Sequence, residues 1–171
     1  QNFYTQYCSF TKKKDNEFSI LGGNTVYPSN PDDAVLETFE NNNKDRNYLV
    51  SFICDEFTSL CPKTGQPDFA RFEIFYIPRD RMIESKALKL YLFSFRNVGS
   101  FHEEVTNRIF TDLWRVMDPK FMRVVGDFSV RGGIAIKPIV MANNEKDSSP
   151  SFDSCVQEIL LNWDRIKSTL K

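Results

Sequence analysis

NYLVSFICDEFTSLCPKTGQPDFARFEIFYIP, residues 47–78, contains two β-patterned runs on either side of a proline-rich segment. In residues 47–57, aromatic and apolar side chains recur at every second position: Tyr48, Val50, Phe52 and Cys54. A period of two is the spacing of one face of a β-strand. Residues 70–78 are rich in aromatic and branched side chains and end at a proline. The stretch therefore predicts an antiparallel pair of strands with a broad, structured connection.

The connecting segment, residues 58–68 (TSLCPKTGQPD), places Cys61 seven residues before Asp68. Pro62 and Pro67 fix φ, and Gly65 permits a turn that other residues resist. We expect a stiff loop here, neither helix nor strand, with a thiol close to a carboxyl group.

The remainder of the central region predicts two helices and then two strands. Residues 82–97 are apolar almost all round, as in a buried helix, and Gly99 ends this run. A second helix is indicated by apolar residues at helical spacing: Phe101, Val105, Ile109, Leu113 and Val116. Ser100 is its expected N-cap, with Glu103 completing a capping box. Strands follow at 121–130 and 132–140, joined around Arg131. This order predicts an α+β fold, an antiparallel sheet with both helices on one face.

Both ends of the chain differ from this central pattern. Residues 1–46 are polar and turn-rich, and predict an N-terminal arm containing a short helix at 32–39, capped by Asp32 or Asp33. Residues 141–171 predict a polar linker and a last helix. Its apolar stripe comprises Val156, Ile159, Leu160, Trp163 and Ile166. We therefore divide the chain into an arm (1–46), a catalytic domain (47–140), and a linker with a C-terminal helix (141–171).

Composition narrows the functional classes. The chain has 171 residues and a formal net charge of −1, and its one basic cluster, residues 12–14, is expected to be a solvated tail. This balance argues against nucleic acid as a partner. No apolar run approaches the roughly 20 residues that span a bilayer, and no secretory signal is visible. Four cysteines and one histidine show no zinc spacing, so we expect no metal. Because no export signal is visible, we expect free thiols and a cytoplasmic location.

Two residues of the connecting loop are candidates for catalysis. Cys61 is either an inert, buried small side chain or a nucleophile, which needs thiolate character. Asp68 either caps a turn or acts as a general acid beside the thiol. Cys54 alternates with strand residues that face the core, and is expected to be structural.

Three further segments carry polar residues with two possible roles. Ser85 is expected to cap a helix, with Glu84 favouring the helix dipole, or the helix start binds an anion near Lys86. His102 and Glu103 begin the next helix, as cap residues or as part of a convergent polar site. Arg131-Gly132-Gly133 is either a plain hairpin turn or a turn that lets a ligand phosphate approach the backbone.

Taken together, TSLCPKTGQPDFA, ESKALKLYLFSFRN, FHEE and RGG, in this order, resemble the single-domain NADPH-dependent 7-cyano-7-deazaguanine reductases. These enzymes are nitrile reductases of queuosine biosynthesis. The resemblance covers residues 47–140 well and LGGNTVYPSNPDDAVLE more loosely. It implies a tunnelling fold (T-fold), with a four-stranded antiparallel sheet and two helices on one face. It also implies a ring-forming homo-oligomer, commonly a decamer of two stacked pentamers with active sites between subunits.

The resemblance further implies a mechanism. Cys61 would attack the nitrile carbon to give a covalent thioimidate, Asp68 would protonate the nitrogen, and two NADPH would supply hydrides to yield the aminomethyl product. The residues implied to hold the deazaguanine are Ile83, Glu84, Ser85, His102 and Glu103. Those implied to meet NADPH are Ser85, Lys86, Arg131 and Gly132.

Alternatives remain at this point. An amidinotransferase-like relative forms the same thioimidate but adds ammonia to it, and the intact Glu84-Ser85-Lys86 motif argues against that activity. A zinc cyclohydrolase of the same fold needs Cys and His ligands that the single His102 does not supply. A non-catalytic ring-forming binding module would not need Cys61. One departure from some relatives is Val105, which stands where they carry a second, protective cysteine.

Overall fold

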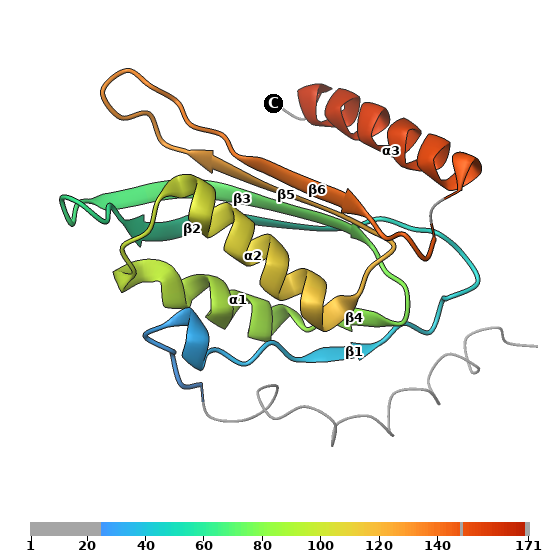
Figure 1. The fold of residues 1–171 in the computed structure, drawn as a ribbon, viewed down its shortest axis with the longest axis horizontal. Coiled ribbons are helices and arrows are strands. Elements are labelled where there is room, and N and C mark those ends of the chain that lie inside the picture. The colour runs from blue at the N-terminus through green and yellow to red at the C-terminus, as the bar shows by residue number, and fades with distance from the viewer. Residues whose placement is uncertain (1–24, 148, 170–171) are drawn as a thin grey trace, which may run out of the picture.

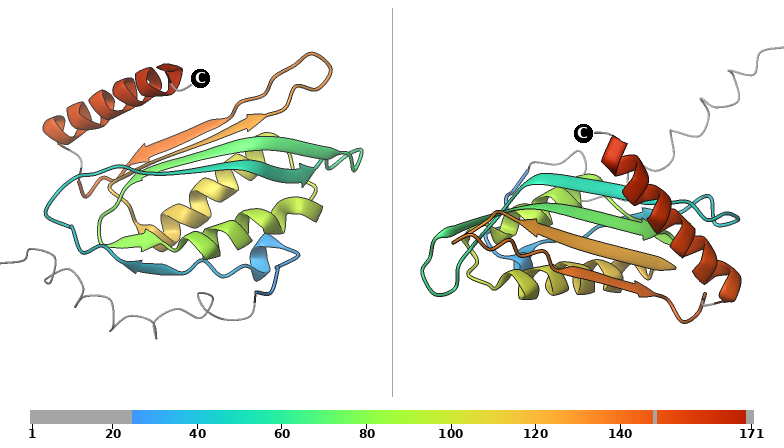
Figure 2. Two further views of the ribbon diagram at one scale, coloured as in Figure 1. Left: turned by 180° about the vertical axis from the view of Figure 1, so that it is seen from behind. Right: turned by 90° about the horizontal axis from the view of Figure 1, so that it is seen from above.

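The structure is a computed structural model that describes residues 25–147 and 149–169. Its centre is a four-stranded antiparallel sheet in the order β2-β3-β5-β6. The strands are β2 (Val50–Leu60), β3 (Pro67–Ile77), β5 (Phe121–Phe128) and β6 (Ile139–Asn143). Helices α1 (Ser85–Phe93) and α2 (His102–Met117) cover one face of the sheet, and α3 (Pro150–Thr169) lies on the other (Figures 1 and 2). The predicted α+β fold, with two central helices on one face, is confirmed.

The main core lies between the sheet and the pair α1 and α2. Alternate residues of β3 face this layer, and Phe72, Ile74 and Tyr76 are almost completely buried there. From α2, Ile109 and Leu113 close the same layer. Each side chain of this size stabilises the fold by about 1.5–3 kcal/mol when removed from water. The apolar face of the sheet, with its period of two residues, therefore packs against the apolar faces of the helices, with their period of 3.6.

A second, smaller core explains the C-terminal helix. Ile77 and Phe121 of the opposite sheet face pack with Phe152 and Val156 of α3. The Trp163 ring meets Phe75 edge-on, with ring centroids 4.9 Å apart. The predicted last helix is confirmed, and it begins inside the segment expected to be linker; the side chain of Ile166 lies outside the described part.

Strand β2 is displaced along the chain from its predicted bounds: the strand expected at 47–57 covers Val50–Leu60, so Tyr48 lies outside it. A bulge between Cys54 and Phe57 shifts the register, so that Phe57 takes the core position. The expectation that all of 58–68 is loop is wrong, because residues 58–60 belong to β2 and residues 67 and 68 to β3. Pro67 is tolerated because the carbonyl of its partner Leu60 accepts a hydrogen bond from the N–H of Ser100, and so does not need the N–H that proline lacks. Only residues 61–66 form the turn.

The helix starts also differ from prediction. Met82 and Ile83 form part of β4 (Arg81–Ile83), so α1 begins at Ser85. Its N-cap is Glu84, whose carboxylate accepts hydrogen bonds from the N–H groups of Lys86 and Ala87. Ser85 is therefore not the cap.

The N-cap of helix α2 lies one residue after the expected cap, Ser100. Phe101, with 49% of its surface exposed, is its N-cap and not part of the apolar stripe. Glu104, not Glu103, reaches back to the N–H of Phe101 (3.2 Å) and the hydroxyl of Ser100 (3.1 Å). After the helix, a left-handed Asp118 leads into the turn before β5.

The helix predicted at residues 32–39 is wrong. A short 3₁₀ turn, η2 (Pro31–Asp33), is capped by Asn30, and the chain then enters β1 (Thr38–Glu40). Strand β1 exists because β4 lies across from it as an antiparallel partner. The first part of the predicted arm, residues 1–24 with the lysine cluster, lies outside the described residues.

The final hairpin is also displaced from its expected place. The strand predicted at 132–140 is β6, at residues 139–143, and β5 ends at Phe128. Residues 129–138 form a long loop that projects beyond the sheet (Figure 1). At its tip, Arg131 and Ile134 exchange backbone hydrogen bonds. Within the described residues, no helix combines the length and the apolar character needed to cross a membrane.

Candidate active site

Cys61 lies in the turn between β2 and β3. Its backbone carbonyl accepts the N–H of Gly65, which has a φ of 69°, and its N–H donates to Gln66. The Thr64 hydroxyl and the backbone N–H groups of Lys63 and Thr64 point at the sulfur and, with a contribution from Arg131, lower the pKa of the Cys61 thiol to about 7. A large share of the thiol is therefore the reactive thiolate at neutral pH.

Cys54 has the opposite environment. It lies within β2 and packs partly against the main core. Burial raises the pKa of its thiol. This is the character of a structural cysteine, as expected from the sequence.

Asp68 is a buried carboxylate with a partner on each oxygen. Its side chain is 2% exposed. Arg131 donates from Nη1 to Oδ1 at 2.5 Å, and His102 Nε2 lies 3.3 Å from Oδ2. Arg131 also donates from Nη2 to Gln66 at 2.7 Å. Because the same guanidinium contributes to lowering the pKa of Cys61, it links the thiol to the carboxylate.

His102 is held in place by an aromatic contact. It is the first residue of α2, and its ring stacks on Phe128 of β5 with centroids 4.0 Å apart and an interplanar angle of 15°. The ring therefore lies flat over the end of β5 with one edge at Asp68. Glu103, the next residue, is exposed beside it.

Arg131 reaches the site because of the turn that follows it. Gly132 and Gly133 have φ values of 57° and 81°, which side chains rarely adopt, and they close a tight hairpin. The hairpin-turn interpretation is thus correct for the backbone. The arginine side chain points back to the sheet, whereas Gly132 stays exposed at the tip.

The second group of expected site residues, 83–86, lies elsewhere. Ile83 and Glu84 are buried, and the two carboxylate oxygens of Glu84 cap α1. Helix α1 has nine residues, so its axis spans roughly 13 Å before η3 (Ser94–Asn97) begins. Only after η3 does the chain meet the end of β2, where Val98 accepts from Leu60. One chain therefore brings Cys61, Asp68, His102 and Arg131 together, but places residues 83–86 at the opposite end of α1.

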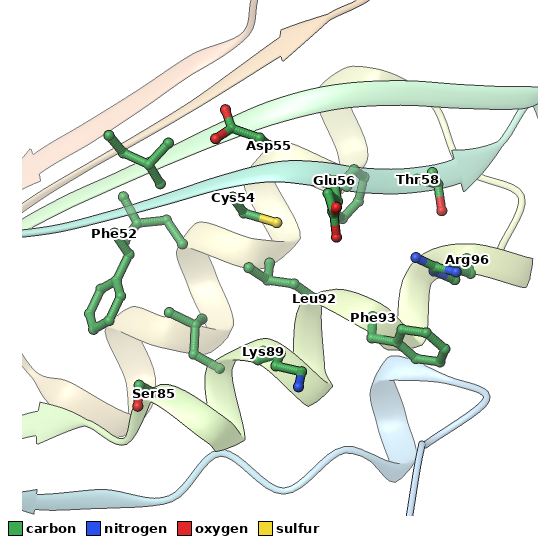
Figure 3. A pocket seen from close by; sticks show the side chains of 14 residues that line it. Phe52, Cys54, Asp55, Glu56, Thr58, Ser85, Lys89, Leu92, Phe93 and Arg96 are labelled. Atoms are coloured by element: carbon green, nitrogen blue, oxygen red, sulfur yellow. The ribbon is translucent and has the colours of Figure 1, made fainter.

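A pocket of about 520 Å³ follows α1 along the edge strand β2. Ser85 lies at one end and Thr58 and Arg96 at the other, with the Cys54 sulfur pointing toward α1 (Figure 3). Lys89 and Arg96 supply positive charge on the α1 and η3 side. The apolar part of the lining comes from Phe52, Phe57, Ile74, Leu88, Leu92 and Phe93.

Comparisons with known proteins identify the family of the chain. Residues 67–147 match the family model described as QueF-like protein. Over 127 residues the chain is 54% identical to the NADPH-dependent 7-cyano-7-deazaguanine reductase of Parabacteroides distasonis, covering 74% of this chain and 81% of that protein. The chain belongs to this reductase family.

Other members of the reductase family are equally similar. The enzyme of the same name from Neisseria meningitidis serogroup B is 50% identical over 147 residues, covering 85% of this chain and 92% of that protein. The one from Bacillus mycoides is 56% identical over 123 residues, or 71% and 74% of the two chains. A crystal structure of the archaeosine synthase QueF-Like in the apo form has a TM-score of 0.52 at 20% identity, covering 60% of this chain and 96% of that one. This last likeness concerns the fold alone.

The structure adds site residues that the sequence did not reveal. Thr64 and Gln66 belong to the Cys61 turn, and Phe128 supports the ring of His102. The position of Thr64, three residues after Cys61 in a short turn, could have indicated from the sequence that its hydroxyl lies close to the thiol. The role of Phe128 depends on packing across the sheet, for which the sequence has no local pattern. In the described part of the chain, no cluster of His, Cys, Asp and Glu is arranged to hold a metal ion.

Proposed function

We propose that this chain reduces the nitrile of 7-cyano-7-deazaguanine to the aminomethyl group, with NADPH as reductant, in queuosine biosynthesis. The observation that carries the proposal is the Cys61 thiol, with its pKa of about 7, beside the buried Asp68. Membership of the reductase family indicates the reaction, and the members that we compared are NADPH-dependent by name, which indicates the cofactor.

Cys61 and Asp68 would carry the first step. The thiolate attacks the nitrile carbon, one carbon–nitrogen π bond breaks, and the nitrogen takes a proton from Asp68 to give a thioimidate. The thiol proton is thus the one that ends on nitrogen, with Asp68 as its carrier. His102 and Arg131 orient the carboxyl group, since each contacts one of its oxygens.

Two NADPH, each of which would supply one hydride when bound, would take the nitrile to the amine. The chemistry of the pocket along α1 fits such a group. Its apolar lining suits a flat ring. Lys89 and Arg96 offer positive charge to phosphates on the helix side, away from the carboxylates of Asp55 and Glu56 on β2. We assign Ser85, Lys86, Arg131 and Gly132 to this cofactor, and residues 83–85 with His102 and Glu103 to the deazaguanine.

Two copies of the chain would complete each site. Residues 83–86 and the Cys61 cluster lie at opposite ends of α1, so one copy supplies the nucleophile and its neighbour supplies the Glu84-Ser85-Lys86 segment. We propose a T-fold ring, with two stacked pentamers as the expected assembly. The division into an arm (1–46), a catalytic domain (47–140) and a C-terminal extension (141–171) stays a proposal. So does a cytoplasmic location, which suits a catalytic thiol.

The two alternatives have less support. The likeness to an archaeosine synthase is one of fold, at 20% identity, whereas the reductases are about 50% identical. A binding module has no use for a thiol whose pKa is lowered by a built turn.

The test is NADPH oxidation, followed by absorbance, with 7-cyano-7-deazaguanine as substrate. We expect two NADPH oxidised per nitrile, and a covalent adduct on Cys61 by mass spectrometry when NADPH is omitted. Cys61→Ala should abolish adduct and turnover, while Cys54→Ala keeps both. An adduct with no NADPH oxidation would refute the reductase, and a dead Cys54→Ala variant with an active Cys61→Ala would refute the nucleophile.

A further inference from the structure

Ser59, in β2, is a buried hydroxyl without a hydrogen bond. Its exposed fraction is 0%, and its Oγ has no partner among the described residues. Burying a hydroxyl unpaired costs stability, so such groups are rare in folded proteins. The contrast with Ser94 is useful, because that hydroxyl is equally buried and donates to the carbonyl of Tyr91 at 2.6 Å.

The unpaired hydroxyl lies directly opposite the candidate acid. Ser59 and Asp68 are cross-strand partners in the pairing of β2 with β3. Two residues after Ser59, the N–H of Cys61 donates to the carbonyl of Gln66, so Cys61 and Gln66 form a hydrogen-bonded pair. Hydrogen-bonded pairs alternate along an antiparallel ladder, so Ser59 and Asp68 form the next one, with Cα atoms about 5.5 Å apart. Their side chains share one face, which is also that of Cys61.

The groups around Asp68 are suited to a carboxylate and not to a carboxylic acid. Arg131 has donors only, and His102 offers a lone pair only while it is neutral. To give a proton to the nitrile nitrogen, Asp68 must first hold that proton, and its O–H then needs an acceptor. Cys61, as a thiolate, is committed to the attack. A hydroxyl accepts as readily as it donates, and Ser59 has its lone pairs unused.

We propose that Ser59 is a positioning residue for Asp68, accepting the hydrogen bond of the protonated carboxyl group before the proton passes to the nitrile nitrogen. No bond to Ser59 is made or broken in that transfer. The unpaired hydroxyl seen in this structure belongs to the state in which Arg131 and His102 hold both carboxylate oxygens. The inference rests on the proposed function, in which Asp68 is the acid.

The test compares Ser59→Ala with Ser94→Ala, the same change at an equally buried but hydrogen-bonded serine. The readout is the rate of adduct formation with 7-cyano-7-deazaguanine, without NADPH, as a function of pH. We expect Ser59→Ala to lower this rate about tenfold, the effect of one lost hydrogen bond. Its alkaline limb should move to lower pH by about one unit, because the protonated Asp68 is less favoured.

Stability separates this role from a purely structural one. Ser59→Ala removes an unpaired buried group, so its melting temperature should equal or exceed that of the wild type. Ser94→Ala should melt lower and form the adduct at the wild-type rate. Alkylation of Cys61 by iodoacetamide should be unchanged in both variants.

Three results would overturn the inference. The first is a Ser59→Ala variant with the wild-type rate of adduct formation and the wild-type pH profile. The second is a Ser59→Ala variant that forms the adduct more slowly but also melts at a lower temperature than the wild type. The third is a Ser59→Ala variant in which alkylation of Cys61 by iodoacetamide slows as much as adduct formation does. Wild-type protein that forms no adduct at all would overturn the proposed function as well, which keeps the two failures distinct.

Discussion

Arg131 and Asp68 form an ion pair across 63 residues of sequence, with Nη1 2.5 Å from Oδ1. The arginine sits at a Gly-Gly turn and the aspartate is almost completely buried in β3, so the pair ties the projecting hairpin to the sheet. The same guanidinium also contributes to lowering the pKa of Cys61. One cation therefore acts on both groups that we assign to the covalent step.

Arg131→Ala should raise the pKa of the Cys61 thiol. In the wild type, the rate of alkylation by iodoacetamide should rise with pH and reach half its plateau near pH 7, because the thiolate is the reacting species. Without the guanidinium the thiolate is less favoured, and the midpoint should move to higher pH. Arg115→Ala, on the exposed side of α2, is the matched control and should keep the wild-type midpoint. An unchanged midpoint in Arg131→Ala would exclude this contact from thiol activation.

Thr64→Val should have the larger effect on the same midpoint. The Thr64 hydroxyl is the main cause of the lowered pKa, and valine keeps its shape while removing the donor. Each unit of upward shift reduces the thiolate at pH 6 about tenfold. Alkylation followed by mass spectrometry at pH 6 checks this. If Thr64→Val alkylates faster than Arg131→Ala at that pH, the ranking of the two contacts is wrong.

The elements that could be predicted from the sequence are those with a periodic pattern of apolar residues. The sequence did not predict elements whose conformation depends on a partner far along the chain. Strand β2 was predictable from its alternating apolar residues, and β3 from its run of aromatic and branched residues, which are buried on both faces of the sheet. The point where the two strands end was not predictable. Pro67 has no N–H and disrupts a strand only where a partner needs one, and here the Leu60 carbonyl bonds to Ser100 instead. The segment at 32–39 has acidic residues suited to a helix start, yet it forms only a short 3₁₀ turn and then enters β1 at Thr38, because β4 lies beside that strand.

The site divides in the same way. Cys61 and Asp68 were suggested by one stiff local segment, which the structure keeps as a turn between paired strands. The contacts that give them their character come from Arg131 and His102, far along the chain, so no local pattern contains them. Ser59 was invisible for the same reason. Its role depends on the strand register that places it opposite Asp68, and on the lack of a hydrogen-bond partner for its hydroxyl among the described residues.

Helix α3 should add stability without acting on the thiol. Phe152→Ala empties a buried position between Ile77 and Phe121, which should cost about 3 kcal/mol. In a chain of this size that corresponds to roughly 2–4 °C of melting temperature for each kcal/mol. Leu161→Ala, 70% exposed on the same helix, is the control and should melt as the wild type does. The Cys61 alkylation midpoint should be the same in both. A Phe152→Ala variant as stable as the control would show that α3 is not anchored to the sheet through this cluster.

A mixing experiment tests whether two copies share each site. Cys61→Ala lacks the nucleophile, and Ser85→Asp places a negative charge where a cofactor phosphate is expected, at a helix start that tolerates aspartate. Each variant alone should be inactive. If a site takes its Cys61 cluster from one copy and residues 83–86 from the next, random co-assembly after dissociation leaves about a quarter of the sites with both intact halves. NADPH oxidation by the mixture should then recover to about a quarter of the wild-type rate. A site contained within one chain would leave the mixture as inactive as its two components.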